Sequence, residues 1–110
     1  AYLFDVKALD LTLQGLEYEH DHQLTLIERV FFYLPFEHTE DLIIQERSIL
    51  AFESLLAVSL PETRLLYERF LQYAYDHHET IKKFGRFPYR NVHLGRNSTE
   101  DELIYLNKTK

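Results

Sequence analysis

The stretch ILAFESLLAVSLPETRLL, residues 49–66, decides the fold class. In its first half, apolar side chains such as Ile49, Phe52 and Leu56 recur every three or four positions, as the buried face of an α-helix requires. Residues 59–62, Ser-Leu-Pro-Glu, then match a capping box with proline in the first turn, so a second helix should begin with almost no linker. Helices joined by so short a connection pack as antiparallel neighbours. The stretch therefore predicts a helical hairpin.

The same periodicity predicts helices on the N-terminal side. We expect one over residues 5–18, a polar connection at residues 19–22, and a second helix from Leu24 that Pro35 ends. The aromatic and β-branched residues 30–34 have the composition of a strand, but no second strand candidate could pair with them. A helix is therefore preferred there.

The helix of the hairpin's first arm should run over residues 40–58, with Thr39 as its cap and two acids in its first turn. The second arm should end at Gly85, which can adopt the left-handed conformation of a helix end. Its expected buried stripe consists of Leu66, Phe70, Tyr73, His77, Ile81 and Phe84.

Residues 85–98 are expected to be irregular, with Pro88 and Gly95 as structural residues. Thr99 and Glu102 form a second capping box, which opens a short helix through Leu106. The prediction is thus an all-α fold with four main helices and a short C-terminal one. Two hairpins about 34 residues apart also have the period of tetratricopeptide repeats, although the signature residues of that repeat are not legible.

The composition is that of one globular domain covering residues 1–110, because 45% of the 110 residues are apolar and 15% aromatic. The absence of cysteine suits a reducing cytoplasm, and the longest apolar run, residues 30–36, is far too short for a membrane span. The chain has no methionine and opens at Ala1 in an apolar run, so we expect the natural protein to begin earlier.

The formal charge of −6 is unevenly distributed. Residues 82–96 carry five basic side chains and no acid, whereas the remainder, with 7 basic and 18 acidic residues, has a charge of −11. A polyanion needs a basic surface, so nucleic-acid binding is disfavoured.

Motifs for metal or covalent chemistry are weak. Glu17-x-x-His20 and Glu19-x-x-His22 have the spacing used in di-iron bundles, but both lie on one stretch, where a solvated acidic connection is the simpler interpretation. His77 and His78 point about 100° apart on a helix and could not chelate one metal. No serine elbow or phosphate loop occurs, so we expect no metal and no cofactor.

One polar set could bind a ligand. Helix termini, arginines and histidines together suit an anion or another small molecule. The candidates are His38, Asp41, Gln45, His77, Arg86, Arg90, Asn91 and Arg96. The alternative is an internal network, in which Glu40, Asp41 or Glu102 pairs with those arginines and fixes residues 85–98 on the helices.

These residues also carry a family resemblance. The segments are HTED at 38–41, QERS at 45–48, FGRFPYRN at 84–91, LGR at 94–96 and STEDE at 98–102, together with His77. They resemble the bacterial family called domain of unknown function 924, over nearly the whole chain. The family usually has histidine in place of Tyr89 and serine in place of Thr39. The resemblance implies a tetratricopeptide-like helical fold and a further N-terminal portion, and it brings no known activity.

We therefore expect a non-catalytic helical domain that presents a surface to a protein partner and associates as a homodimer. The alternative is a binding site for a small anionic molecule, with or without catalysis, made by the polar set.

Overall fold

The computed structural model describes residues 7–9, 11 and 24–108, which contain helices and no strand. The helices are α2 (Leu26–Glu37), α3 (Leu42–Val58), the 3-10 helix η2 (Pro61–Thr63), α4 (Arg64–Phe84), the 3-10 helix η3 (Pro88–Arg90), α5 (Asn91–Leu94) and α6 (Glu100–Lys108). This confirms the all-α fold class and the choice of helix for residues 30–34. The helix expected over residues 5–18, the connection after it and the two Glu-x-x-His motifs fall mostly or wholly outside the described residues.

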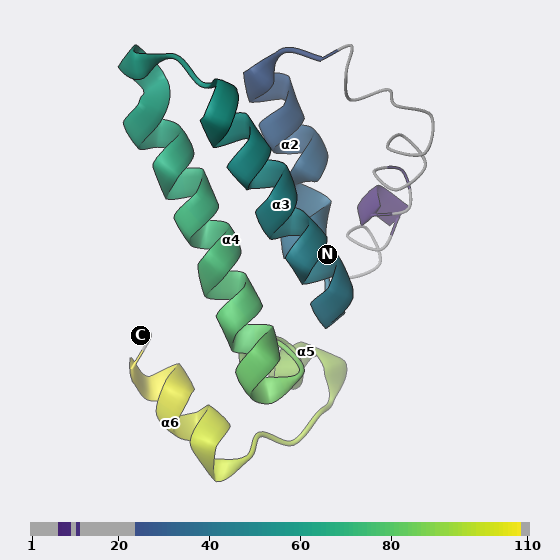
Figure 1. The fold of residues 1–110 in the computed structure, drawn as a ribbon. Coiled ribbons are helices and arrows are strands. Elements are labelled where there is room, and N and C mark those ends of the chain that lie inside the picture. The colour runs from purple at the N-terminus through teal and green to yellow at the C-terminus, as the bar shows by residue number, and fades with distance from the viewer. Residues whose placement is uncertain (1–6, 10, 12–23, 109–110) are drawn as a thin grey trace.

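Helices α2, α3 and α4 lie side by side, with α3 in contact with both of the others (Figure 1). The 3-10 helix η2 reverses the chain between α3 and α4, so the predicted antiparallel hairpin is confirmed. Helices α5 and α6 lie at the far end of α4 (Figure 1). None of the described helices is both long and apolar enough to cross a bilayer.

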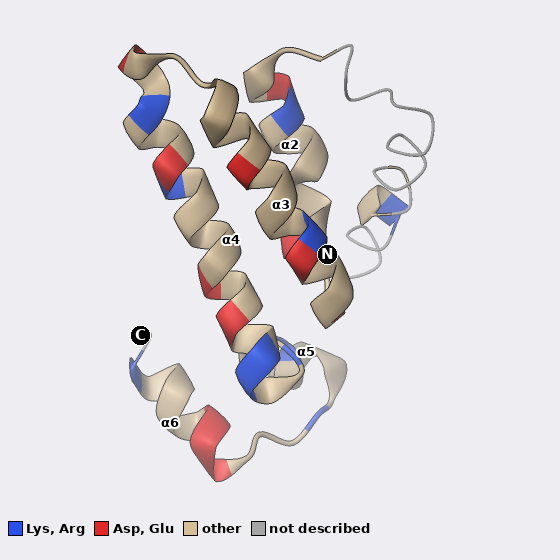
Figure 2. Ribbon diagram, in the orientation of Figure 1, with Lys and Arg blue, Asp and Glu red and all other residues tan. Residues whose placement is uncertain are grey.

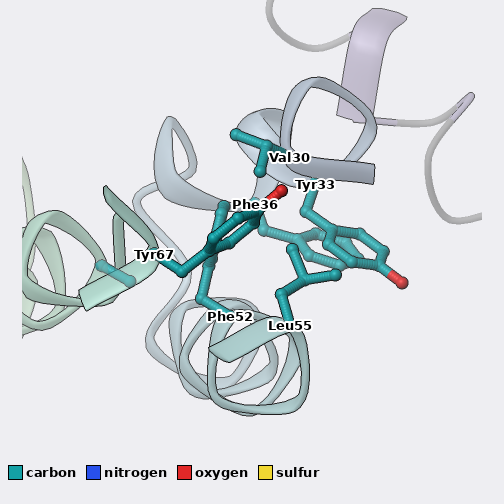
Figure 3. Packing of buried hydrophobic residues seen from close by; sticks show 7 residues of the cluster. Val30, Tyr33, Phe36, Phe52, Leu55 and Tyr67 are labelled. Carbon is teal, nitrogen blue, oxygen red and sulfur yellow. The ribbon is translucent and has the colours of Figure 1, made fainter. Parts of the chain in front are cut away.

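The core lies between these three helices and is largely aromatic (Figure 3). The Tyr33 ring packs edge-on against Phe52, with ring centroids 6.2 Å apart, and lies parallel to Phe36 at 6.3 Å. Such ring pairs are stabilising beyond the apolar area that they bury. The remaining buried members of the core are Val30, Leu55, Tyr67 and Ala74.

Pro35 does not end its helix, and this prediction was wrong. α2 continues to Glu37 with Pro35 inside its last turn. Proline removes one backbone donor, but continuing the helix places Phe36, which is 1% exposed, in the core. Burial of such a side chain contributes about 1.5–3 kcal/mol, which offsets much of the roughly 3 kcal/mol that an interior proline costs.

Two predicted caps were also wrong. The N-cap of α3 is Asp41, whose carboxylate accepts from the Ile43 and Ile44 amides at 2.9 and 3.1 Å, while the Thr39 hydroxyl accepts only from the Asp41 amide. Ser59 does not cap the start of the next helix; it is the C-cap residue of α3, and its hydroxyl donates to the Leu56 carbonyl at 2.8 Å. Pro61 can start η2 without a side-chain cap, since it has no N–H to satisfy.

Ile81 on α4 is buried as predicted, but earlier in this helix the buried stripe lies one residue later than predicted. The buried side chains are Tyr67, Ala74 and Ile81, whereas Leu66 and Tyr73 are 43% and 60% exposed. One residue corresponds to a rotation of about 100° about the helix axis. Periodicity alone did not resolve it, because both stripes of α4 contain large apolar residues.

The C-terminal predictions were mostly correct. α4 ends at Phe84, and Gly85 follows in the left-handed conformation with φ of 73°. The capping box is confirmed, because the Glu102 amide donates to the Thr99 hydroxyl at 3.1 Å and the Thr99 amide donates to the Glu102 carboxylate at 2.8 Å. Residues 85–98 were expected to be irregular, yet they contain η3 and α5.

A pair of substitutions on α3 tests this packing. Phe52→Ala should lower the free energy of unfolding by about 3–5 kcal/mol, because it leaves a cavity among the core rings. Leu50→Ala, at a side chain that is 65% exposed on the same helix, should change it by less than about 0.5 kcal/mol. Urea unfolding measures both, and equal losses would contradict this arrangement of the core.

Candidate functional site

Segment 85–98 is held to the helices by two arginine–glutamate pairs. In the first, Arg86 donates from Nε and Nη2 to the two carboxylate oxygens of Glu102, at 2.8 and 2.7 Å. Its Nη2 also donates to the Asn97 carbonyl at 2.7 Å. The hydrogen bonds from Arg86 lower the pKa of Glu102 to about 2, although burial opposes the shift. This pair therefore fixes the start of the segment to the first turn of α6.

The second pair joins Arg96 to Glu40, just before α3. The Arg96 guanidinium donates from Nη1 and Nη2 to the two oxygens of Glu40, at 2.8 and 3.0 Å. Its Nε donates to the Asn91 side-chain oxygen at 3.0 Å, and Nη2 also reaches the Phe87 carbonyl at 3.2 Å. This two-point geometry is the strongest form of an arginine–carboxylate contact.

Asn91 positions Arg96 and is almost fully buried. Its carbonyl accepts from the Arg96 amide at 2.8 Å, and its side-chain amide donates to the Ser98 hydroxyl at 3.0 Å. Gly95, which lies between Asn91 and Arg96 in the chain, has a φ of 65°, and any residue with a side chain would be strained in this conformation. Asn91 and Gly95 thus have structural roles in this turn.

Phe87 lies near the start of the segment and is buried. Its amide donates to Glu40 at 2.6 Å, and its ring contacts His77 edge-on at 5.7 Å and the Arg90 guanidinium at 4.9 Å. Partial burial raises the pKa of the Glu40 carboxyl, but the hydrogen bonds from Arg96 and from the Phe87 amide lower it by more. Glu40 is therefore an ionised acceptor for two parts of the segment.

The candidate residues at the start of α3 make other contacts. His38 is the C-cap residue of α2, and Asp41 caps α3. Gln45 is buried, and its side-chain amide donates to the carbonyls of Glu37 and Thr39, at 2.9 and 2.8 Å. Asp41 and Gln45 thus stabilise the connection between α2 and α3.

Glu37 is the residue that the sequence analysis missed. It is 3% exposed, and its Oε1 has no hydrogen-bond partner among the described residues. Oε1 lies 3.6 Å from Nδ1 of His77, and burial raises the pKa of Glu37 to about 7. One signal could have found it: Glu37 lies seven positions after Val30, on the buried stripe of α2.

A cavity of about 110 Å³ opens beside His77. Three separate parts of the chain form its walls, namely α4, the segment after Gly85 and α6. Its lining residues are Asp76, His77, Thr80, Phe87, Tyr89 and Tyr105. Of the predicted candidates, only His77 lines it.

The basic stretch found in the sequence is partly neutralised within the fold. Two of its five cations, Arg86 and Arg96, are paired with Glu102 and Glu40. Lys82 and Lys83 occupy the last turn of α4, where a positive charge complements the helix dipole (Figure 2). The geometry thus matches the internal network for two of the three arginines, whereas Arg90 is buried against the Phe87 and Tyr89 rings.

The contribution of the second ion pair can be measured. Arg96→Ala should lower the free energy of unfolding by about 1–3 kcal/mol, because it leaves the Glu40 carboxylate without its main partner. Arg47→Ala, which removes an exposed arginine of α3, should cost less than about 0.5 kcal/mol. If chemical denaturation gave the same value for both variants, the pair would not stabilise the segment.

The raised pKa of Glu37 predicts a dependence of stability on pH. Between pH 4.5 and about 7, the unfolded chain releases this proton while the folded chain retains it. The free energy of unfolding should therefore fall by about 1–3 kcal/mol as pH rises through that window. Glu37→Gln should remove this slope and stabilise the protein at pH 8.

Thermal and urea unfolding at pH 5 and pH 8 measure this effect. The control is Glu62→Gln, at an exposed position of η2, which should leave the slope unchanged. A slope that persists in Glu37→Gln would assign the pH dependence to other groups.

Similarity to known proteins agrees with this architecture. A structure of a protein of unknown function from Agrobacterium tumefaciens is 33% identical, with a TM-score of 0.75. The match covers 94% of this chain and 53% of that one, so the chain spans about half of its relative's length. No curated protein matches the chain. The sequence model of the family DUF924, bacterial proteins of unknown function, matches residues 1–110, and the chain belongs to that family.

Proposed function

We propose that the chain is a non-catalytic helical interaction domain, with a tetratricopeptide-like arrangement of its hairpins. The observation that carries this proposal is the pairing of Arg86 and Arg96 with glutamates of the same chain. Each is joined at two points to a carboxylate of the same chain, so these motif residues fix segment 85–98. A scaffold needs such internal connections, whereas an anion site needs guanidinium groups that can receive a ligand.

The surface proposed for the partner is the open face of α4. On this helix, the side chains of Leu66 and Tyr73 are exposed although they belong to an apolar stripe. Arg69, Gln72, Tyr73 and Asp76 line a shallow groove of about 320 Å³. α4 forms one edge of the three-helix layer, and only its C-terminal end lies near α6 (Figure 1). A second copy of the chain is the partner favoured here, because exposed apolar stripes are commonly covered by association.

The alternative is a small-anion site that uses His38, Asp41, Gln45, His77, Arg86, Arg90, Asn91 and Arg96. It has less support because several of these side chains are already used in contacts within the fold. Asp41 and Gln45 bind backbone groups around the α2–α3 connection, and Asn91 holds Arg96. Nucleic-acid binding has the least support, since the acidic residues of Figure 2 extend along α3 and α4.

The oligomeric state tests the proposal. Light scattering coupled to size exclusion should give a mass that rises from one to two chains with protein concentration. The double variant Leu66→Ser, Tyr73→Ser should weaken this association at least about tenfold, because exposed anchors of this kind contribute most of an interface's affinity. The control Leu50→Ser, on α3, should associate like the unmodified chain. A monomer at the highest concentration would exclude the homodimer.

A further inference from the structure

The cavity beside His77 has a distinctive hydrogen-bonding character. Nδ1 of His77 lies 2.6 Å from the Tyr73 carbonyl, and a carbonyl can only accept. Nδ1 therefore carries the proton in the neutral ring, and Nε2 has a free lone pair. Nε2 takes part in no hydrogen bond with the described residues, and about a third of the side chain is exposed. The imidazole thus offers an acceptor at the cavity wall.

The next two polar groups are acceptors as well. The Thr80 hydroxyl donates its only proton to the Asp76 carbonyl at 3.0 Å. In the 3.5 Å contact between Thr80 and Tyr105, the phenol must therefore be the donor. The Tyr105 oxygen keeps its lone pairs for a ligand. Its ring is held in place by Phe84, at a centroid distance of 5.2 Å.

The charge of the wall is negative. Asp76 is the one lining residue with a carboxylate, and one oxygen of that carboxylate accepts from Gln72 at 2.9 Å. No lysine or arginine is among the lining residues, and the Arg90 side chain is buried against the rings of Phe87 and Tyr89. The other surfaces are aromatic, from Phe87, Tyr89 and Tyr105. The Arg90 guanidinium already lies over the Phe87 and Tyr89 rings. The Asp76 carboxylate and the Tyr105 ring are therefore left to attract a cation, and the acceptors require a donor.

From this arrangement we infer that the cavity binds the primary ammonium group of a small organic amine. The three N–H donors of an ammonium group match His77 Nε2, the Asp76 carboxylate and the Tyr105 oxygen. A volume of about 110 Å³ accommodates only a few heavy atoms, since a cavity of about 150 Å³ holds benzene. Because the cavity opens to solvent, the carbon chain of the amine extends outward. This site does not require the proposed protein interface.

The buried carboxyl of Glu37 helps to set the tautomer of His77. It lies 3.6 Å from Nδ1 of His77, on the side opposite to the accepting nitrogen. A carboxyl group there favours the tautomer that leaves Nε2 free, as in other carboxyl–histidine arrangements. Glu37 is thus a positioning residue for His77.

A titration of the unmodified protein with n-butylammonium tests the inference, with n-butanol and butyrate as matched probes. In two-dimensional NMR spectra, n-butylammonium should cause saturable shifts at His77, Thr80 and Tyr105 (lining residues of the cavity). Butanol and butyrate should not, because they lack the charge or carry the opposite one. Equal shifts with all three probes, or no saturable shift with any, would overturn the inference.

Two variants separate this site from general amine binding to an acidic protein. Asp76→Asn should weaken n-butylammonium binding about tenfold, because it removes a charge-assisted hydrogen bond. Glu62→Gln removes the same charge on η2, away from the cavity, and should bind as the unmodified protein does. Equal affinity of the two variants would place the amine elsewhere. Asp76 lines both the cavity and the groove on α4, but light scattering and the n-butylammonium titration are separate measurements, so failure of one proposal can be told from failure of the other.

Discussion

The contact between Glu40 and Arg96 determines how segment 85–98 fits against the start of α3. Glu40 precedes α3 and Arg96 follows α5, so this pair closes a loop of 56 residues in sequence. The same carboxylate accepts the Phe87 amide, and the same guanidinium donates to the Phe87 carbonyl. One residue of segment 85–98 is therefore held through both of its backbone polar groups. A partly desolvated pair of this kind stabilises the fold only while every group in it is satisfied.

The position of Phe87 in turn determines the cavity beside α4. Its ring contacts His77 and Tyr89, both of which line that cavity. On the opposite side, the Arg86–Glu102 pair sets the start of α6 and hence the place of Tyr105. Two ion pairs that resemble an anion site in sequence thus act as supports for walls formed by other residues.

The sequence predicted the helices better than their ends. Apolar periodicity is a property of whole helices, and it found α2, α3 and α4 with the hairpin between them. The ends of helices depend on single side chains, and each of these side chains can make several different contacts. Thr39 and Asp41 can both cap a helix, and the choice of Asp41 goes together with the use of Glu40 by Arg96, which is distant in sequence. Similarly, Pro35 is tolerated because Phe36 reaches a core that no local pattern describes.

The polarity of the cavity could not be read from the sequence for the same reason. A motif rich in arginine and histidine indicates an anion-binding site. The number of donors left for an anion, however, depends on which acidic side chains of the fold pair with these residues. Here Glu40 and Glu102 use the donors of Arg96 and Arg86, and the Tyr73 carbonyl uses the proton of His77. The residues that line the cavity then offer lone pairs, one carboxylate and aromatic rings. A motif rich in basic residues thus produces a site whose electrostatic preference is for a cation, because the fold satisfies the basic residues internally.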